Sequence, residues 1–117
     1  GADSPVTPVD PWGAVRAAVH PTNPAHALSP RAALAAHTRG GWRAARADSD
    51  GSGVLAPGAP ASYAVFAAGP LTADASDERP RTDERSGIPD LSSGRELPRC
   101  LRTVVRGRQI FDSGELP

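Results

Sequence analysis

The chain has 117 residues, of which 38% are hydrophobic and only 4% aromatic, and its 13 basic residues are balanced by 13 acidic ones. This neutrality gives no support for binding to nucleic acid or to an anionic membrane, because both partners select a basic surface. No apolar run approaches the length of a membrane span. The 13 prolines and 12 glycines favour loops, so any core is expected to be thin. A single cysteine, Cys100, excludes an intramolecular disulfide and fits a cytoplasmic protein.

The first twelve residues combine a carboxylate, a Ser-Pro turn and a helix start. Asp3 follows two small residues, and Asp10 is expected to cap a helix that begins at Pro11. A strand end, an acidic residue, a loop and a helix follow one another in this way on the catalytic face of a parallel α/β barrel. The strand expected before Asp3 is almost wholly missing, and the sequence contains no Met. We therefore interpret the chain as a piece of a larger protein.

Residues 11–46 are predicted to be mainly helical. The first helix, residues 11–20, has three apolar residues on one face at the 3.6-residue period, namely Trp12, Val15 and Val19. A second helix is capped by Ser29 and runs to Thr38. The Gly40-Gly41 pair should break or bend it, since each glycine costs about 1 kcal/mol relative to alanine in a helix.

Farther along the chain the pattern changes from helical to extended. Residues 62–67 are typical of a strand, and residues 101–111 of a hairpin that turns at Gly107. We expect residues 54–67 and 101–111 to pair in one antiparallel sheet. Between them, residues 68–98 contain almost nothing that could pack, which predicts a long mobile loop.

Four stretches, in the expected order, resemble motifs of metal-dependent amidohydrolases. Residues 1–12 are closest to the "G-S-D-x-P-V-x-P-x-D-P-W" stretch of amidohydrolase family 3, the N-substituted formamide deformylase-like proteins. Residues 29–38 are similar to the "S/T-P-x-x-A-L-x-x-x-T" helix that follows the last barrel strand. Residues 53–66 resemble "G-x-L-x-P-G-x-x-A-D-x-x-V", and residues 101–111 the closing "V-x-x-T-x-V-x-G-x-x-V" hairpin.

This resemblance implies how the α+β chain is organised. Residues 1–50 would form the C-terminal end of a (β/α)₈ TIM barrel, with the tip of strand eight and the helices that follow it. Residues 51–117 would supply the C-terminal strands of a composite β-sandwich domain, interrupted by the mobile loop 68–98. The chain would then be a C-terminal fragment of a metal-dependent hydrolase.

The resemblance places Asp3 at the family's aspartate on the tip of the eighth strand. There it would help to hold a catalytic divalent metal, expected to be zinc, and take the proton from the attacking water. The implied reaction is hydrolysis of a non-peptide C–N bond in an amide-like or cyclic small molecule. The sequence departs from the family at Ser62, where the third motif usually has Asp. The family's His-x-His pair, bridging lysine and later histidines are also absent.

Several of these residues have a simpler interpretation. Asp3 can be a loop carboxylate that caps a turn. The three histidines lack His-x-His or His-x₃-His spacing, so they are interpreted as structural or solvated: His20, His26 and His37. Residues 48–51 hint at a calcium loop, but its twelfth position is Ala59 where a bidentate Glu is needed.

The remaining candidates are likewise interpreted structurally. Cys100 has arginines on both sides in the sequence but no candidate base, which indicates a bystander thiol. Trp12 and Trp42 are expected in the core. The Asp-Glu-Arg triplets at residues 77–79 and 83–85 are expected to be solvated surface.

Two functional classes remain open on the sequence. One is the C-terminal fragment of an amidohydrolase that acts on a small molecule. The other is a small non-enzymatic β-rich module that binds a partner through its sheet edge or its long loop. An in-frame His-x-His codon pair in the DNA upstream of Gly1 would favour the enzyme, whereas an initiator codon directly before Gly1 would favour the module. The sequence leaves the oligomeric state undetermined.

Overall fold

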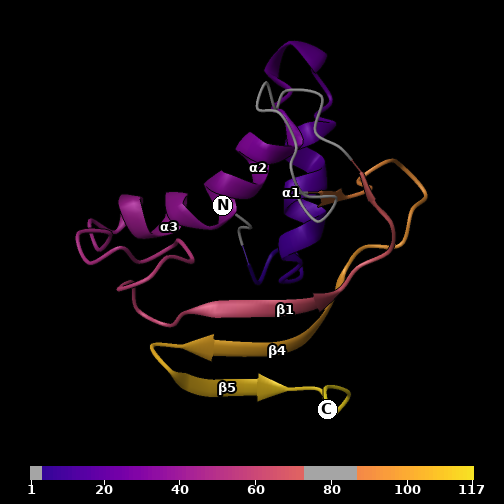
Figure 1. The fold of residues 1–117 in the computed structure, drawn as a ribbon. Coiled ribbons are helices and arrows are strands. Elements are labelled where there is room, and N and C mark those ends of the chain that lie inside the picture. The colour runs from indigo at the N-terminus through magenta and orange to yellow at the C-terminus, as the bar shows by residue number, and fades with distance from the viewer. Residues whose placement is uncertain (1–3, 73–86) are drawn as a thin grey trace. The chain divides into compact units, whose positions relative to one another are not determined.

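A computed structural model describes residues 4–72 and 87–117, which contain three α-helices, one 3₁₀-helix and five strands (Figure 1). The mixture of helix and sheet confirms the α+β class. The chain divides into two compact units. The first unit comprises Gly1–Leu34 and Gly69–Leu97, and the second comprises Ala35–Ala68 and Pro98–Pro117.

Helix α1 (Pro11–Val19) begins as the sequence predicts. The Asp10 carboxylate accepts a hydrogen bond of 2.9 Å from the backbone N–H of Gly13, which would otherwise lack a partner at the helix start. A Cβ at position 13 would collide with the Asp10 carboxylate, so the cap depends on glycine at this position. A short 3₁₀-helix, η1 (Pro24–His26), follows.

Helix α2 (Pro30–His37) also starts at its predicted cap, because the Ser29 hydroxyl accepts from the N–H of Ala32 at 3.2 Å. The predicted break at Gly40-Gly41 is wrong, since both glycines lie inside helix α3 (Arg39–Ala44). The break falls at Thr38, whose φ of −110° and ψ of −90° are not helical. Its hydroxyl bonds the carbonyl of Ala35, and such local side-chain bonds compete with the helix.

The first unit has a small apolar core made of Val15, Ala33, Ile88 and Leu91, with Trp12, Ala18, Val19 and Leu97 packed against it. The predicted apolar face of α1 is therefore confirmed. The prediction that residues 68–98 offer almost nothing to pack is wrong for Ile88 and Leu91, which are 6% and 4% exposed. Arg16 fastens α1 to this stretch, because its guanidinium donates to the carbonyl of Arg95 at 2.5 Å.

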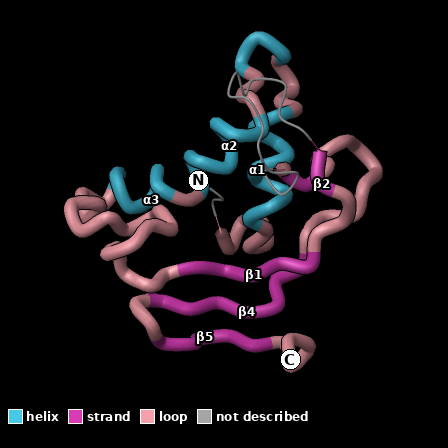
Figure 2. Tube along the Cα trace, in the orientation of Figure 1, coloured by secondary structure: helices cyan, strands magenta, loops and turns pink. Residues whose placement is uncertain are grey.

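Two short strands flank the segment that is not described. Strand β2 (Leu71–Thr72) pairs antiparallel with β3 (Ile88–Pro89). Figure 2 labels β2. Residues 73–86, the central part of the predicted mobile loop 68–98, lie outside the described part of the chain, and so do both Asp-Glu-Arg triplets.

The second unit contains an antiparallel sheet in the order β1-β4-β5 (Figure 1). Its strands are β1 (Tyr63–Ala67), β4 (Arg99–Val105) and β5 (Arg108–Asp112). The predicted pairing of residues 54–67 with residues 101–111 is confirmed for residues 63–67, and Tyr63 lies opposite Val104. Residues 54–62 remain a loop instead of extending β1. Pro57 and Pro60 cannot donate to a ladder, and Gly58 has a φ of +86°.

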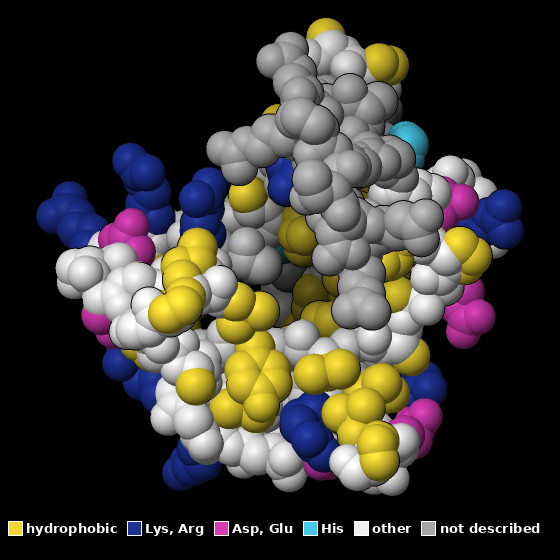
Figure 3. Space-filling model, in the orientation of Figure 1, with side chains coloured by type: hydrophobic (Ala, Val, Ile, Leu, Met, Phe, Trp, Pro, Cys, Tyr) yellow, Lys and Arg dark blue, Asp and Glu magenta, His cyan; other side chains and the backbone are white. Residues whose placement is uncertain are grey.

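Apolar side chains remain on the surface of this sheet. Figure 3 shows hydrophobic side chains gathered over the region of β1, β4 and β5. The exposed fractions reach 54% for Ile110 and 47% for Phe111. The sheet therefore buries only part of the apolar area that its strands carry.

Candidate functional site

The residue predicted to act in catalysis, Asp3, lies outside the described residues. Its roles as proton acceptor and metal ligand therefore stay predictions. The described chain starts at Ser4 with a turn, and Asp10 then caps α1. Asp10 is thus a structural carboxylate seven residues away from Asp3 along the chain.

The three histidines are distributed over separate elements. His20 is the C-cap of α1, His26 lies in η1 and His37 ends α2. Within residues 4–72 and 87–117, no group of three His, Cys, Asp or Glu side chains could hold a metal ion. The described residues alone therefore do not form a metal centre.

Asp50, from the stretch that hinted at a calcium loop, has its carboxylate oxygens bonded to protein groups. One oxygen accepts from the N–H and the hydroxyl of Ser52, at 3.0 and 2.6 Å. The other accepts from the guanidinium of Arg106 at 3.0 Å. The Ser52 hydroxyl, followed by the Ser52 N–H and Arg106, holds the pKa of Asp50 below its usual value.

The tip of the β4–β5 hairpin joins several segments of the second unit. Arg106 and Gly107 have φ values of +48° and +79°, and two positive values are what a tight hairpin turn requires. The N–H of Arg106 donates to the Ser62 hydroxyl at 3.0 Å, and the N–H of Gly107 to the Ala61 carbonyl at 2.8 Å. The Arg106 guanidinium lies 5.9 Å from the ring centroid of Trp42. The sequence predicts the turn but not its contacts with Ala61, Ser62 and Trp42, because no local sequence pattern indicates them.

The thiol of Cys100 faces no acid or base in its described contacts. Its Sγ lies 3.4 Å from the hydroxyl of Thr103 and 3.8 Å from the carbonyl of Arg102. The neighbouring arginines are bonded to carboxylates, Arg99 to Glu115 and Arg102 to Asp112. Cys100 is half-buried and fits the interpretation as a bystander thiol.

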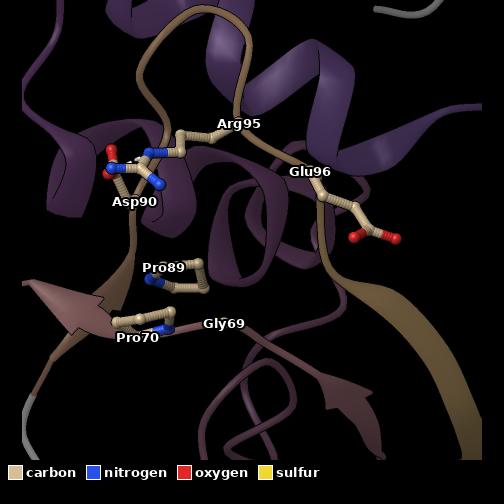
Figure 4. Close-up of a pocket in the computed structure, with 6 residues that line it drawn as sticks. All are labelled: Gly69, Pro70, Pro89, Asp90, Arg95 and Glu96. Atoms are coloured by element: carbon tan, nitrogen blue, oxygen red, sulfur yellow. Dashed lines mark ion pairs between the residues drawn. The ribbon is translucent and has the colours of Figure 1, made fainter.

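The first unit has an open pocket of about 270 Å³ (Figure 4). It is lined by Gly69, Pro70, Pro89, Asp90, Arg95 and Glu96. Figure 4 shows Arg95 reaching toward Asp90 while Glu96 points away, and the Arg95–Asp90 ion pair measures 3.2 Å. Hydrogen bonds from Ser92, and then the charge of Arg95, hold the pKa of Asp90 below its usual value. The lining includes no nucleophile next to a base, so it does not form a catalytic group on its own.

None of the helices in residues 4–72 and 87–117 has the length and apolar character needed to cross a membrane.

Comparison with known proteins identifies the chain's relatives at the level of a family. The model of amidohydrolase family 3, described as "Amidohydrolase family", matches residues 1–111. Searches of curated proteins and of solved structures found no match. The matched region covers almost the whole chain. It includes the Asp3 segment and every helix and strand of the described residues, except for Asp112 at the end of β5. The chain therefore belongs to the amidohydrolase family.

Proposed function

We propose that this chain is the C-terminal part of a metal-dependent amidohydrolase. The enzyme would hydrolyse a non-peptide C–N bond in an amide-like or cyclic small molecule. The observation that carries the proposal is the family match over residues 1–111, because it includes the Asp3 segment and the closing hairpin in one continuous run. At a finer level, the opening residues favour an N-substituted formamide deformylase-like enzyme. The single cysteine favours a cytoplasmic location.

In this proposal, residues 1–50 end a (β/α)₈ barrel and residues 51–117 contribute strands to a composite β-sandwich. Two observations support it. Asp10 starts a helix shortly after Asp3, as expected at the catalytic face of a barrel. In the described chain, β1 and β5 are the outer strands of the sheet, and apolar side chains on it are exposed. Further strands and a second sheet layer would cover such a surface.

Asp3 is the catalytic residue that we assign to this chain. Its carboxylate would bind the metal and accept the proton of the attacking water, which is the work of a general base. A bound divalent metal, expected to be zinc, lowers the pKa of water toward neutrality. The described residues contain no metal centre of their own, so the other ligands would come from the rest of the enzyme.

The test compares two carboxylate-to-amide changes in the full-length enzyme loaded with zinc. Asp3→Asn keeps the shape of the side chain but removes the proton acceptor, so kcat should fall about 10²- to 10⁴-fold. Asp10→Asn should leave kcat almost unchanged, because Asn caps a helix about as well as Asp. The substrates are an N-substituted formamide and a set of cyclic amides, and zinc content is measured for each protein.

Two results would contradict the proposal. An Asp3→Asn enzyme that turns over like the parent would leave Asp3 as a loop residue. A zinc-loaded parent that hydrolyses none of these amides would contradict the proposed reaction class itself.

A further inference from the structure

Helix α3 and the turn that ends it carry three arginines, Arg39, Arg43 and Arg46. Arg39 and Arg43 are four residues apart, so they are neighbours on one face of the helix. All three side chains are exposed. Figure 3 shows basic side chains projecting from the surface around α3. Among the residues that the structure describes, none of these three guanidinium groups has a hydrogen-bond or ion-pair partner.

Of the other four arginines of the second unit, all but Arg108 differ in this respect. Three of them form ion pairs on or beside the sheet: Arg99 with Glu115, Arg102 with Asp112 and Arg106 with Asp50. The sequence of this unit contains seven arginines and four acidic residues, although the whole chain is neutral. Three of the four arginines of this unit that lack an ion pair among the described residues therefore lie on α3 or on the turn that ends it, and the fourth, Arg108, lies on β5.

A second and independent observation concerns the backbone of Arg46. The N–H of Arg46 donates to the carbonyl of Arg43, and the N–H of Ala47 to that of Trp42. This is the Schellman pattern, whose left-handed position is normally glycine. Arg46 occupies that position with a φ of +55°. A strained conformation that retains a charged side chain is a reason to look for a function of that side chain.

We propose that Arg39, Arg43 and Arg46 form a docking surface for an acidic segment of a partner protein. Guanidinium groups bind carboxylates through two parallel hydrogen bonds, which suits arginine to this task. Four residues of helix rise about 6 Å, and alternate residues of an extended peptide are about 6.6 Å apart. Glutamates at every second position of an extended segment can therefore meet Arg39 and Arg43 in turn.

Other anionic partners fit this surface less well. Proteins that bind DNA through its backbone commonly contact six to ten phosphates, roughly twice or more what three arginines provide. Stacking of bases needs an open aromatic face, and the ring of Trp42 already has the Arg106 guanidinium over it. A membrane-surface helix needs a broad apolar face, whereas α3 has the sequence Arg-Gly-Gly-Trp-Arg-Ala.

The test measures binding of the whole protein to a fluorescein-labelled peptide of four alternating Glu-Gly units by fluorescence anisotropy, at about 0.05 M and 0.5 M salt. Binding is expected at low salt and should weaken at high salt. The change of all three arginines to Gln should weaken binding about 10-fold or more, and Arg43→Gln alone about 3-fold. Arg43→Lys should recover only part of that loss, because lysine keeps the charge but not the paired donors.

The matched control is Arg108→Gln. Arg108 is exposed, belongs to the same unit and likewise has no side-chain partner among the described residues, so the change removes the same charge. It should weaken binding less than about 1.5-fold. Arg46→Gly supplies a second readout. It should raise the thermal midpoint by relieving the positive φ, while it weakens peptide binding.

The proposal fails if the peptide does not bind at low salt, or if Arg108→Gln weakens binding as much as Arg43→Gln does. Tighter binding of a thymidine oligonucleotide of equal charge would identify a nucleic-acid surface instead. Circular dichroism checks the fold of each variant. If the triple variant unfolds, the comparison of Arg43→Gln with Arg108→Gln decides the question alone.

Discussion

The hydroxyl of Ser62 accepts a hydrogen bond of 3.0 Å from the backbone N–H of Arg106, and so joins the start of β1 to the tip of the β4–β5 hairpin. These residues are 44 positions apart in the sequence. Ser62 stands where the resembling motif usually has Asp. A serine hydroxyl and a carboxylate can both accept this bond, so the departure from the motif keeps the acceptor.

Removing the acceptor should loosen this junction. Ser62→Ala leaves the Arg106 N–H without its protein partner and should lower the free energy of unfolding by about 1 kcal/mol. Ser62→Asp restores an acceptor and should be at least as stable as the parent protein. Urea denaturation followed by circular dichroism measures both. Equal stability of Ser62→Ala and the parent would mean that the bond contributes nothing measurable.

Two glycines with positive φ allow strain to be separated from crowding. Gly53 and Gly58 have φ values of +91° and +86°, so alanine is strained at both positions. A Cβ at Gly53 would lie only 2.8 Å from the Cα of Arg39, whereas a Cβ at Gly58 meets nothing within 4 Å. Gly58→Ala should therefore cost about 1 kcal/mol of stability and Gly53→Ala about 2 kcal/mol or more.

Thermal unfolding of the two alanine variants measures this difference. If Gly53→Ala and Gly58→Ala lose equal stability, residue 53 does not lie as close to α3 as the structure shows.

Acid should weaken the C-terminal edge of the sheet. The N–H of Gly114, followed by Arg102, holds the pKa of the Asp112 carboxyl below its usual value of 3.8. A carboxyl whose pKa is lower in the folded than in the unfolded state stabilises the protein at any pH above its pKa in the unfolded state. This contribution is lost as the pH falls through its pKa in the folded state. Asp112→Asn should therefore be less stable than the parent at pH 7, and the two should converge as the pH falls through the lowered pKa of Asp112 in the folded protein.

Thermal midpoints measured between pH 2 and 7 at constant salt test this expectation. Asp48→Asn is the control, because Asp48 is exposed and its carboxylate makes no ion pair among the described residues. A difference between parent and Asp112→Asn that stays constant down to pH 2 would contradict the linkage.

The features that the sequence predicted are those with a local signature. Asp10 and Ser29 were found because a capping side chain bonds a backbone N–H two or three residues ahead. The hairpin was found because Gly107 interrupts two alternating segments. Ile88 and Leu91 were missed, since isolated apolar residues among prolines and charges show no period. Their burial depends on α1 and α2, which are far away in the sequence.

The candidate site was predictable to a smaller extent. Asp3 was assigned through resemblance to a family. The match over residues 1–111 supports the family, and the role of Asp3 stays a prediction. The contacts of Arg106 with Asp50 and Trp42 could not be anticipated, because they join residues 56 and 64 positions apart. No spacing rule relates residues across such a distance until the sheet is in place.

The sheet order β1-β4-β5 also fixes the order in which its strands can pair during synthesis. A two-residue turn joins β4 and β5, and hairpins of this kind close in about 1–10 μs. In contrast, 31 residues separate Ala67 from Arg99, the first residue of the strand that pairs with β1. At about 5–20 residues per second, β1 leaves the ribosome roughly two to six seconds before its partner exists. During that interval β1 is an unpaired strand, open to pairing with other chains.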